Sequence, residues 1–236
     1  MTPTLETNAA FSAAFLSELD LKIAARNVLL HPFYQAWNAG TLTREALQDY
    51  AAQYYKHVAA FPTYLSAAHS NTPDAETRRV LLQNLCDEEA GRPNHPELWL
   101  QFAEGMGVSR AEAEAAPARP ETSALVDTFR DICRNNSFTD AIAALYAYES
   151  QIPEVSATKI AGLKSRYGVT DDATLKYFAV HAEADIIHRA EERALLAKHI
   201  ATPEQAESAN RAADRALHAV WNLLSGVCER HAIAAC

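Results

Sequence analysis

The hydrophobic residues of this chain recur with the spacing of amphipathic helices, and no segment alternates apolar and polar residues as a half-buried strand does. From about residue 8 to residue 29, Phe11, Phe15, Leu19 and Ile23 follow one another at intervals of four. Side chains at this interval lie on the same face of a helix. Glycine is scarce and alanine is abundant, which also favours helix. The sequence therefore predicts an all-α protein.

Caps and prolines divide the first half of the chain into separate helices. A short helix is expected in HPFYQAWNAG, with Pro32 in its first turn and Gly40 as its stop. Thr43 is a good N-cap for the helix that follows. Pro62 is expected to break or kink that helix, because proline lacks a backbone N–H. Another helix is expected to begin at residues 72–73 and to continue through LLQNLCDEEA as far as residues 91–93.

The second half of the chain predicts fewer and longer helices. A shorter helix around PELWLQFAEG leads into a region punctuated by glycines at 105 and 107 and prolines at 117 and 120. Three long helices are expected beyond it, at about 139–167 with Pro153 inside, at 171–200 and at 203–231. Neither a tandem repeat nor a low-complexity linker divides the chain. We therefore expect one helical domain over residues 1–236, with residues 1–8 as a loose tail.

Composition narrows the classes of partner and compartment. The formal net charge of −9 offers no electrostatic route to nucleic acid or to an anionic membrane. The N-terminus is acidic and lacks a long apolar run, so neither a signal peptide nor a membrane helix is expected, and the protein is predicted to be cytoplasmic. The four cysteines lack zinc or redox spacing, and we expect three helix-face thiols and one at the loose end: Cys86, Cys133, Cys228 and Cys236.

The segment HAEADIIH carries the strongest chemical signal. Steps of four and seven residues place His181, Asp185 and His188 on one face of a helix. The two histidines lie roughly 10 Å apart along the axis, which suits two metal ions about 3.5–4 Å apart with the carboxylate between them. Two imidazoles and a carboxylate are also the ligand set of non-haem iron. The competing interpretation is a solvated polar face, because Glu183, Glu191 and Glu192 are close by.

Two further segments offer ligands of the same kind. CDEEAGRPNH places Glu88 and His95 seven residues apart, on one side of a helix if that helix continues past Gly91. A charged helix end is the alternative for this pair. Glu149 lies in the apolar stretch ALYAYESQIP, where a carboxylate is costly unless it is paired with an arginine or bound to metal. Pro153 follows four residues later, and helix irregularities often lie beside functional sites.

Together these segments offer three carboxylates and three imidazoles on three helices. Three negative charges partly balance two divalent ions, and open coordination positions can take water or dioxygen. The spacing differs from the ferritin-like pattern of Glu and Glu-x-x-His in two halves. The sequence thus predicts a different helical scaffold for two metal ions, with the ligands Glu88, His95, Glu149, His181, Asp185 and His188.

Five segments of the chain resemble a known family: HPFYQAW, YAAQYYKHVAAFPTYLSAAHS, NLCDEEAGRPNHPELW, LYAYESQIP and HAEADIIHRAEE. They are similar to the death-domain-associating (CADD) proteins and their bacterial relatives, in the haem-oxygenase-like group that also contains PqqC and TenA. The resemblance runs from about residue 28 to residue 196. It implies a bundle of about seven helices, often dimeric, that encloses two iron ions or iron with manganese. The six ligands named above match the family's ligand types.

The resemblance also implies a reaction. CADD-like proteins are associated with making p-aminobenzoate for folate, using dioxygen, an external reductant and residues of the protein itself. The position that matches the ring donor is Tyr34, and the position that matches the amino donor is Lys159. Tyr50, Tyr148 and Tyr177 lie in matching segments and are candidates for relaying electrons or radicals. From the residues alone, the tyrosine is equally explained as a core aromatic and the lysine as a surface residue.

Other functions stay open at this point. The same metal site would serve an oxygenase that acts on an external amine or aromatic substrate, and a PqqC-like oxidase would need no metal. A protein-binding module is the third alternative, since the family name comes from association with death domains and the surface is acidic. The remaining histidines lack a partner at ligand spacing, although His57 and His69 could line the cavity; the others are His31, His199, His218 and His231.

Overall fold

The computed structural model of the chain describes residues 5–234, and the side chains of residues 9–234. Within this range the structure consists of helices without strands, which confirms the predicted all-α class. The expected number of about seven helices is too low, since the described residues form eleven α-helices and one 3₁₀-helix. They are α1 (Leu5–Ala25), η1 (Val28–Leu30), α2 (Pro32–Ala39), α3 (Arg44–Asn71), α4 (Ala75–Glu89), α5 (His95–Gly105), α6 (Arg110–Ala115), α7 (Pro120–Asn135), α8 (Phe138–Glu149), α9 (Ile152–Arg166), α10 (Asp172–His199) and α11 (Pro203–Arg230).

Prolines account for most of the difference from the predicted helices. Pro120 and Pro153 lie in the first turns of α7 and α9, where the missing N–H costs nothing. The expected helix at 139–167 is therefore two helices, and the region after Pro117 contains a helix that the sequence analysis missed. Pro62, in contrast, lies inside α3, and the expected break does not occur. A buried position in a helix of 28 residues lets packing offset the lost hydrogen bond.

Three smaller findings concern the start of α4, the N-terminal residues and the cysteines. Helix α4 begins at Ala75 and not at residues 72–73, and the side chain of Asp74 caps it by accepting a hydrogen bond from the backbone N–H of Thr77. Residues 5–8, expected in a loose tail, already belong to α1, and residues 1–4 lie outside the described residues. Cys133 and Cys228 are buried and Cys86 is exposed, whereas Cys236 lies outside the described residues.

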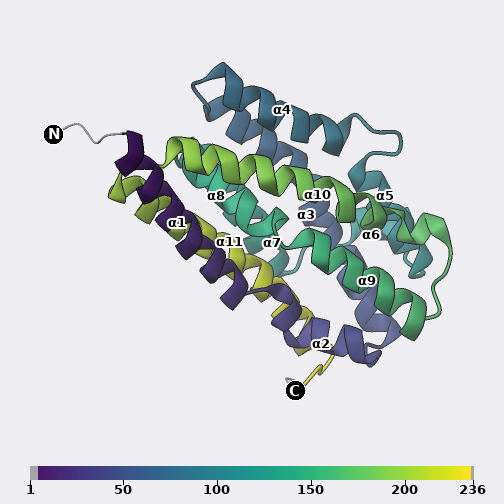
Figure 1. Ribbon diagram of the computed structural model, residues 1–236. Coiled ribbons are helices and arrows are strands. Elements are labelled where there is room, and N and C mark those ends of the chain that lie inside the picture. The colour runs from purple at the N-terminus through teal and green to yellow at the C-terminus, as the bar shows by residue number, and fades with distance from the viewer. Residues whose placement is uncertain (1–4, 235–236) are drawn as a thin grey trace.

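Helix α8 lies at the centre of the bundle. Every side chain from Thr139 to Glu149 is buried, since α8 packs against α11, α10 and α7. Helix α10 packs in turn against α9 and α5, and α3 packs against α7, α4 and α5. Helices α1 and α11 run side by side along one edge of the bundle (Figure 1). The acidic end of α8 therefore reaches the interior, where α4, α5 and α10 converge.

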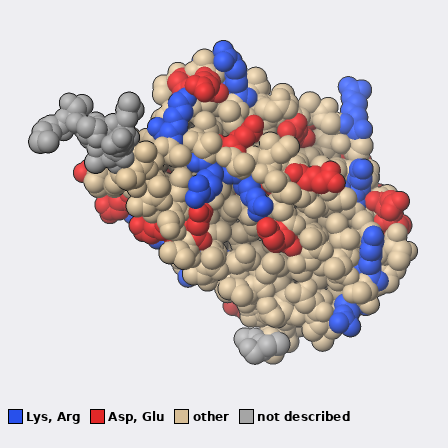
Figure 2. Space-filling view, in the orientation of Figure 1, with Lys and Arg blue, Asp and Glu red and all other residues tan. Residues whose placement is uncertain are grey.

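One face of the molecule shows how its charged side chains are distributed. On the face shown in Figure 2, basic and acidic side chains alternate without one dominant patch, in keeping with a moderate net charge of −9. None of the described helices combines the length and the apolar character that a membrane span requires.

A close approach of α2 and α9 positions two residues of interest. Tyr34 lies on α2 and Lys159 lies on α9, one turn before Gly162. Gly162 faces the fully buried indole of Trp37, and a Cβ at this glycine would lie 2.5 Å from the indole Nε1. The absence of a side chain at this position therefore sets the distance between the two helices.

We expect Gly162→Ala to lower the free energy of unfolding by about 1–3 kcal/mol, because the added methyl group overpacks the contact with Trp37. Urea denaturation followed by circular dichroism measures this change. Lys164→Ala, at an exposed position on the same helix, is the matched control and should shift stability by less than about 0.5 kcal/mol. Equal stability of Gly162→Ala and the wild type would contradict the packing argument.

Candidate metal centre

All six predicted ligands are buried and converge from four helices. Helix α4 contributes one, α5 one, α8 one and α10 three. They form two groups, and within each group one candidate ligand atom from every residue lies within 4.8 Å of the others. We call these groups the Glu88 cluster, which contains Glu88, His95 and His181, and the Glu149 cluster, which contains Glu149, Asp185 and His188.

The Glu88 cluster is closed by a turn and not by a continuous helix. Helix α4 ends at Glu89, and α5 begins at His95 with the side chain of Asn94 as its N-cap. The condition that one helix continues past Gly91 is thus not met, but the turn still directs His95 inward. The Nδ1 atom of His95 lies 2.9 Å from Oε1 of Glu88.

The tautomer of His181 leaves one ring nitrogen free to bind a metal. Its Nδ1–H donates to the backbone carbonyl of Tyr177 one turn earlier, at 2.8 Å. The Nε2 atom then carries a lone pair and lies 3.9 Å from Oε1 of Glu88. Burial, together with nearby His95, holds the pKa of His181 well below its usual value. The neutral imidazole is the form that coordinates metal ions.

The Glu149 cluster is held together by His188. The Nδ1 atom of this histidine lies 3.1 Å from Oδ1 of Asp185 and 3.5 Å from Oε1 of Glu149. Although burial opposes it, these two carboxylates raise the pKa of His188 to about 11. Burial in turn raises the pKa of Asp185 to about 7, with a contribution from Glu149.

Residues around the Glu149 cluster orient its members. The side-chain amide of Asn84 donates to both oxygens of Glu149, at 3.1 and 3.3 Å. The Nε2 atom of His188 lies 3.2 Å from Oδ2 of Asp87, which is partly exposed. Such outer partners fix the orientation of metal ligands and tune their basicity.

The structure itself supports metal binding at this place. Nδ1 of His95 forms no hydrogen bond with any described group, although it lies close to Glu88. Between the clusters lies a cavity of about 10 Å³, bounded by Glu88, Glu149 and Asp185 and by apolar and aromatic side chains. Carboxylates and imidazoles facing a small enclosed space are a donor set that suits iron and manganese. The residues therefore fit two divalent ions.

Glu192 is a buried acid that the sequence analysis left on a solvated face. It is 2% exposed, and it lies on α10 four residues after His188 and seven after Asp185. This spacing places it on the ligand face of α10. The signal was therefore present in the sequence, but charged residues are buried so rarely that the periodicity alone did not decide it.

The predicted ring and amino donors lie in a buried aromatic region that we call the donor pocket; its cavity is lined by Tyr34 and not by Lys159. Tyr34 and Lys159 are both buried, and Nζ of Lys159 lies 5.7 Å from the centroid of the Tyr34 ring. The amine donates to the hydroxyl of Tyr50 at 2.6 Å. Rings of Tyr54, Trp99 and other aromatic residues surround the amine at centroid distances of 4.9 to 5.3 Å. Burial in this aromatic surrounding holds the pKa of Lys159 well below its usual value.

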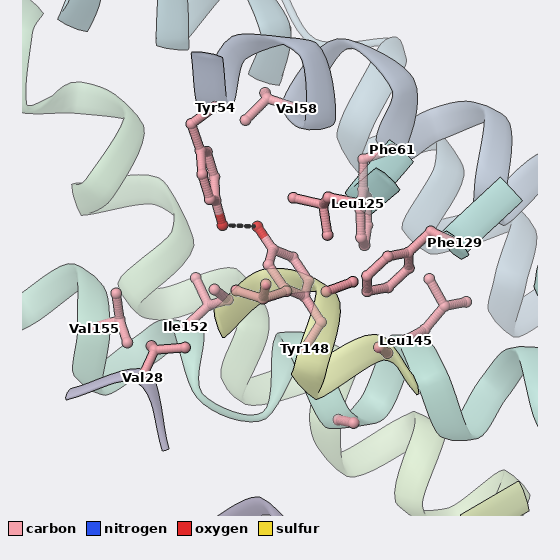
Figure 3. Packing of buried hydrophobic residues seen from close by; sticks show 14 of the residues in the cluster. Val28, Tyr54, Val58, Phe61, Leu125, Phe129, Leu145, Tyr148, Ile152 and Val155 are labelled. Carbon is pink, nitrogen blue, oxygen red and sulfur yellow. Dashed lines mark hydrogen bonds between the residues drawn. The ribbon is translucent and has the colours of Figure 1, made fainter. Parts of the chain in front are cut away.

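Tyr148 connects this donor pocket with the candidate metal centre. Its side chain borders the cavity between the two ligand clusters and also the cavity beside Tyr34. Its hydroxyl is hydrogen-bonded to the hydroxyl of Tyr54 at 2.9 Å, within a dense apolar packing (Figure 3). Tyr54 escaped the sequence analysis, although it follows Tyr50 by one helical turn.

A second aromatic path begins at a ligand. Tyr177 stacks on His181 with ring centroids 4.0 Å apart, and Trp99 packs edge-on against Tyr177 at 4.8 Å. Trp99 then stacks on Tyr54 at 4.9 Å. Trp99 also escaped the sequence analysis. All three predicted relay tyrosines thus lie between or beside the clusters and the donor pocket: Tyr50, Tyr148 and Tyr177.

His57 belongs to the core and lines neither of these two cavities. It is fully buried among aromatic rings, and both of its ring nitrogens lack a hydrogen-bond partner among the described residues. Burial lowers the pKa of His57 to about 3. His69 is half-buried on α3. The other histidines have local roles; His31, for example, caps α2 by accepting from the backbone N–H of Phe33.

The fold and the two ligand clusters define the class: an all-helical protein with a candidate dinuclear metal centre. A domain with a heme oxygenase-like fold from Shewanella denitrificans OS217 superimposes with a TM-score of 0.80 at 18% identity, over 92% of this chain and 94% of that one. A CADD-like protein of unknown function from Nostoc punctiforme PCC 73102 gives a TM-score of 0.77 at 19% identity, over 94% and 99%. Both likenesses establish the fold.

Sequence comparison gives the family. The family model described as "iron-containing redox enzyme" matches residues 48–221. A 4-aminobenzoate synthase from Nitrosomonas europaea is 46% identical over 226 residues, which cover 92% of each chain. The chain therefore belongs to the iron-containing redox enzyme family, and the resemblance inferred from its motifs is confirmed.

We expect chelator-treated protein to rebind about two Mn²⁺ ions per chain, one for each cluster. His95→Ala and His188→Ala should each retain about one, because each removes a ligand from a different cluster. Inductively coupled plasma mass spectrometry after desalting counts the ions. His69→Ala, on α3, is the matched control and should retain both; a wild-type chain that holds no Mn²⁺ would contradict the assignment.

The stability of the protein should depend on pH through His57. Its pKa is about 3 in the folded state against 6.5 ordinarily, so the unfolded state binds more protons between these values. Falling pH in this window therefore costs about 1.4 kcal/mol per pH unit from this residue alone. His57→Leu should remove that share of the slope in urea titrations between pH 6.5 and 4. An unchanged slope in His57→Leu would refute the prediction.

Proposed function

We propose that the protein forms 4-aminobenzoate in an oxygen-dependent reaction, with its own Tyr34 as the source of the ring and Lys159 as the donor of the amino group. A relative at 46% identity is a 4-aminobenzoate synthase, and the family consists of iron-containing redox enzymes. The observation that carries the proposal is the enclosure of this tyrosine and this lysine together, next to the candidate metal centre.

The chemistry of a tyrosine side chain fits the product. In tyrosine the Cβ atom stands opposite the phenolic oxygen on the ring, as the carboxyl group stands opposite the amino group in 4-aminobenzoate. The product thus retains the ring and Cβ of Tyr34. Oxidation by dioxygen converts Cβ to a carboxylate with cleavage from Cα. The nitrogen of Lys159 forms a bond to the ring carbon as the phenolic oxygen leaves as water, and the Cε–Nζ bond of the lysine breaks. The pocket supplies both the ring and a nearby primary amine.

The surroundings of Lys159 prepare it as a nitrogen nucleophile. Burial lowers its pKa, and no carboxylate of the described chain compensates a positive charge there. The neutral amine keeps a lone pair for attack, whereas an ammonium group does not. The hydroxyl of Tyr50 accepts a hydrogen bond from Nζ of Lys159. This bond holds the amine close to the rings of Tyr50 and Tyr34.

The size of the donor pocket favours an internal ring over an external one. The cavity beside Tyr34 measures about 10 Å³, which is room for about one water molecule. A second aromatic ring does not fit there without displacement of Tyr34, Tyr54 or Tyr148. For this reason we prefer the self-sourced ring to an oxygenase that acts on an external amine or aromatic substrate.

The proposed metal ligands are the six residues of the two clusters. Two iron ions, or iron with manganese, would activate dioxygen and withdraw electrons when bound. Tyr148 and Tyr54 form a hydroxyl-to-hydroxyl link between the cluster cavity and the cavity beside Tyr34. Their phenol groups are oxidisable and exchange a proton along this hydrogen bond. Tyr50 and Tyr177 are placed to assist, the former against Lys159 and the latter against His181.

The proposal includes a cellular setting. Product formation would serve folate synthesis in the cytoplasm, with dioxygen as co-substrate and an external reductant as electron source. The protein would act as a homodimer, as the resemblance to CADD-like proteins implies. Six buried ligands also favour this enzyme over a PqqC-like oxidase without metal and over a protein-binding module, because neither function requires buried ligand clusters.

Isotope labelling tests the origin of the product. Protein that contains ring-¹³C tyrosine and side-chain-¹⁵N lysine should, after metal loading and exposure to oxygen with reductant, release doubly labelled 4-aminobenzoate. Mass spectrometry of the protein should show the loss confined to Tyr34 and Lys159. Tyr34→Phe should abolish the product, because a phenyl ring lacks the oxygen that nitrogen replaces.

Tyr64→Phe is the matched control for this test. Tyr64 is fully buried, and its hydroxyl lacks a hydrogen-bond partner among the described residues, so its removal should change neither product yield nor labelling. Unlabelled 4-aminobenzoate, or repeated turnover with an added small molecule, would refute the self-sourced ring and support the external-substrate oxygenase.

A further inference from the structure

Glu192 occupies a position that packing alone does not explain. It is 2% exposed, and neither of its carboxylate oxygens accepts a hydrogen bond from any N–H or O–H group within residues 9–234. A buried carboxylate without a donor is costly, and such groups are otherwise paired or bound to metal. The carboxylate of Glu149 lies within hydrogen-bonding reach of the carboxyl group of Glu192.

Two acceptors that face each other need something positive between them. Glu149 already receives both of its described hydrogen bonds from Asn84. Oδ1 of Asn84 is itself buried without a partner, so the amide is turned to serve Glu149 and leaves Glu192 unserved. Among the described residues, the imidazole of His188 lies against Asp185 and Glu149 and is engaged with them. Glu192 thus faces the Glu149 cluster with both oxygens free.

Charge balance points in the same direction. Two divalent ions carry four positive charges, whereas the six proposed ligands supply only three negative ones. With neutral imidazoles, an additional buried carboxylate makes the centre electrically neutral, which lowers the cost of its burial. Glu192 is the buried, unpartnered acid that can supply this charge.

We propose that Glu192 is a seventh metal ligand, which binds through its carboxylate the ion held by Glu149, Asp185 and His188. The inference rests on the proposed dinuclear centre and extends it. The two positions then differ in chemistry. The Glu88 cluster offers one carboxylate and two imidazoles, whereas the Glu149 cluster with Glu192 offers three carboxylates and one imidazole.

Binding of Mn²⁺ to the chelator-treated full chain tests the proposal without reference to activity. Electron paramagnetic resonance of the free aqueous ion gives the two affinities. We expect Glu192→Gln to weaken one of the two ions by at least about 10-fold, because even outer partners of metal ligands are worth about 10–100-fold. The other ion should bind as in the wild type. Glu191→Gln, one residue away on α10 and only half-buried, is the matched control and should bind both ions normally.

Glu192→Leu separates a ligand from a residue that merely positions Glu149. A protonated Glu192 that donates to Glu149 would be replaced well by glutamine and poorly by leucine, so normal Mn²⁺ binding by the glutamine variant alone would overturn the proposal. Normal binding by both variants would overturn it too and leave the six-ligand centre intact. A wild-type chain without Mn²⁺ affinity would instead refute the dinuclear centre itself.

Melting temperatures measured with and without Mn²⁺ guard against misfolding. The metal-free Glu192→Gln protein should melt at or above the wild-type temperature, since the variant removes an unpartnered buried carboxylate. Its rise in melting temperature on addition of Mn²⁺ should be smaller than that of the wild type. A full wild-type rise would contradict coordination by Glu192.

Discussion

The interior of this protein depends on one electrostatic constraint: four carboxyl groups lie buried where four helices meet. Burial raises the pKa values of Glu88 and Glu192 and raises that of Asp185 to about 7. The imidazoles of His95 and His188 are the groups within contact distance that can offset this charge in the described chain. A carboxylate in a low-dielectric interior is expensive without a counter-charge. Cations bound among these groups would remove most of that cost, so ligand chemistry and fold stability are linked at this point.

The neighbouring donor pocket obeys the opposite rule. Around Lys159 the walls are aromatic, the amine donates its hydrogen bond among the described residues to a neutral phenol, and burial depresses its pKa. Burying a positive charge is costly there, just as burying an anion without a counter-charge is costly among the clusters. Tyr148 lies on the boundary, with one side toward the ligands and its hydroxyl bound to Tyr54. The bundle thus separates a charged region from an apolar one by an aromatic layer, which keeps the candidate metal centre close to the buried amine.

Periodicity predicted the helical class and most helix positions, because the spacing of apolar residues along an amphipathic helix does not depend on how the helices pack together. Periodicity failed at prolines, because a proline can either begin a helix or lie within one. Pro120 and Pro153 begin helices, whereas Pro62 lies within one, and only the tertiary neighbours of each residue decide between these outcomes. The convergence of Glu88 with His95 depends on a turn between two helices. No helical spacing predicts this turn, although the residue types were recognisable.

The residues missed by sequence reasoning share one physical feature: their role depends on what lies opposite them. Tyr54 and Trp99 look like ordinary core aromatics in sequence, and only their stacking and their proximity to Lys159 and Tyr148 distinguish them. The densely packed aromatic side chains leave almost no free volume in the donor pocket. Such a pocket cannot exchange a ring-sized substrate without opening, whereas a ring that belongs to the chain is already in place. The absence of space therefore favours a reaction in which the protein supplies the reactant.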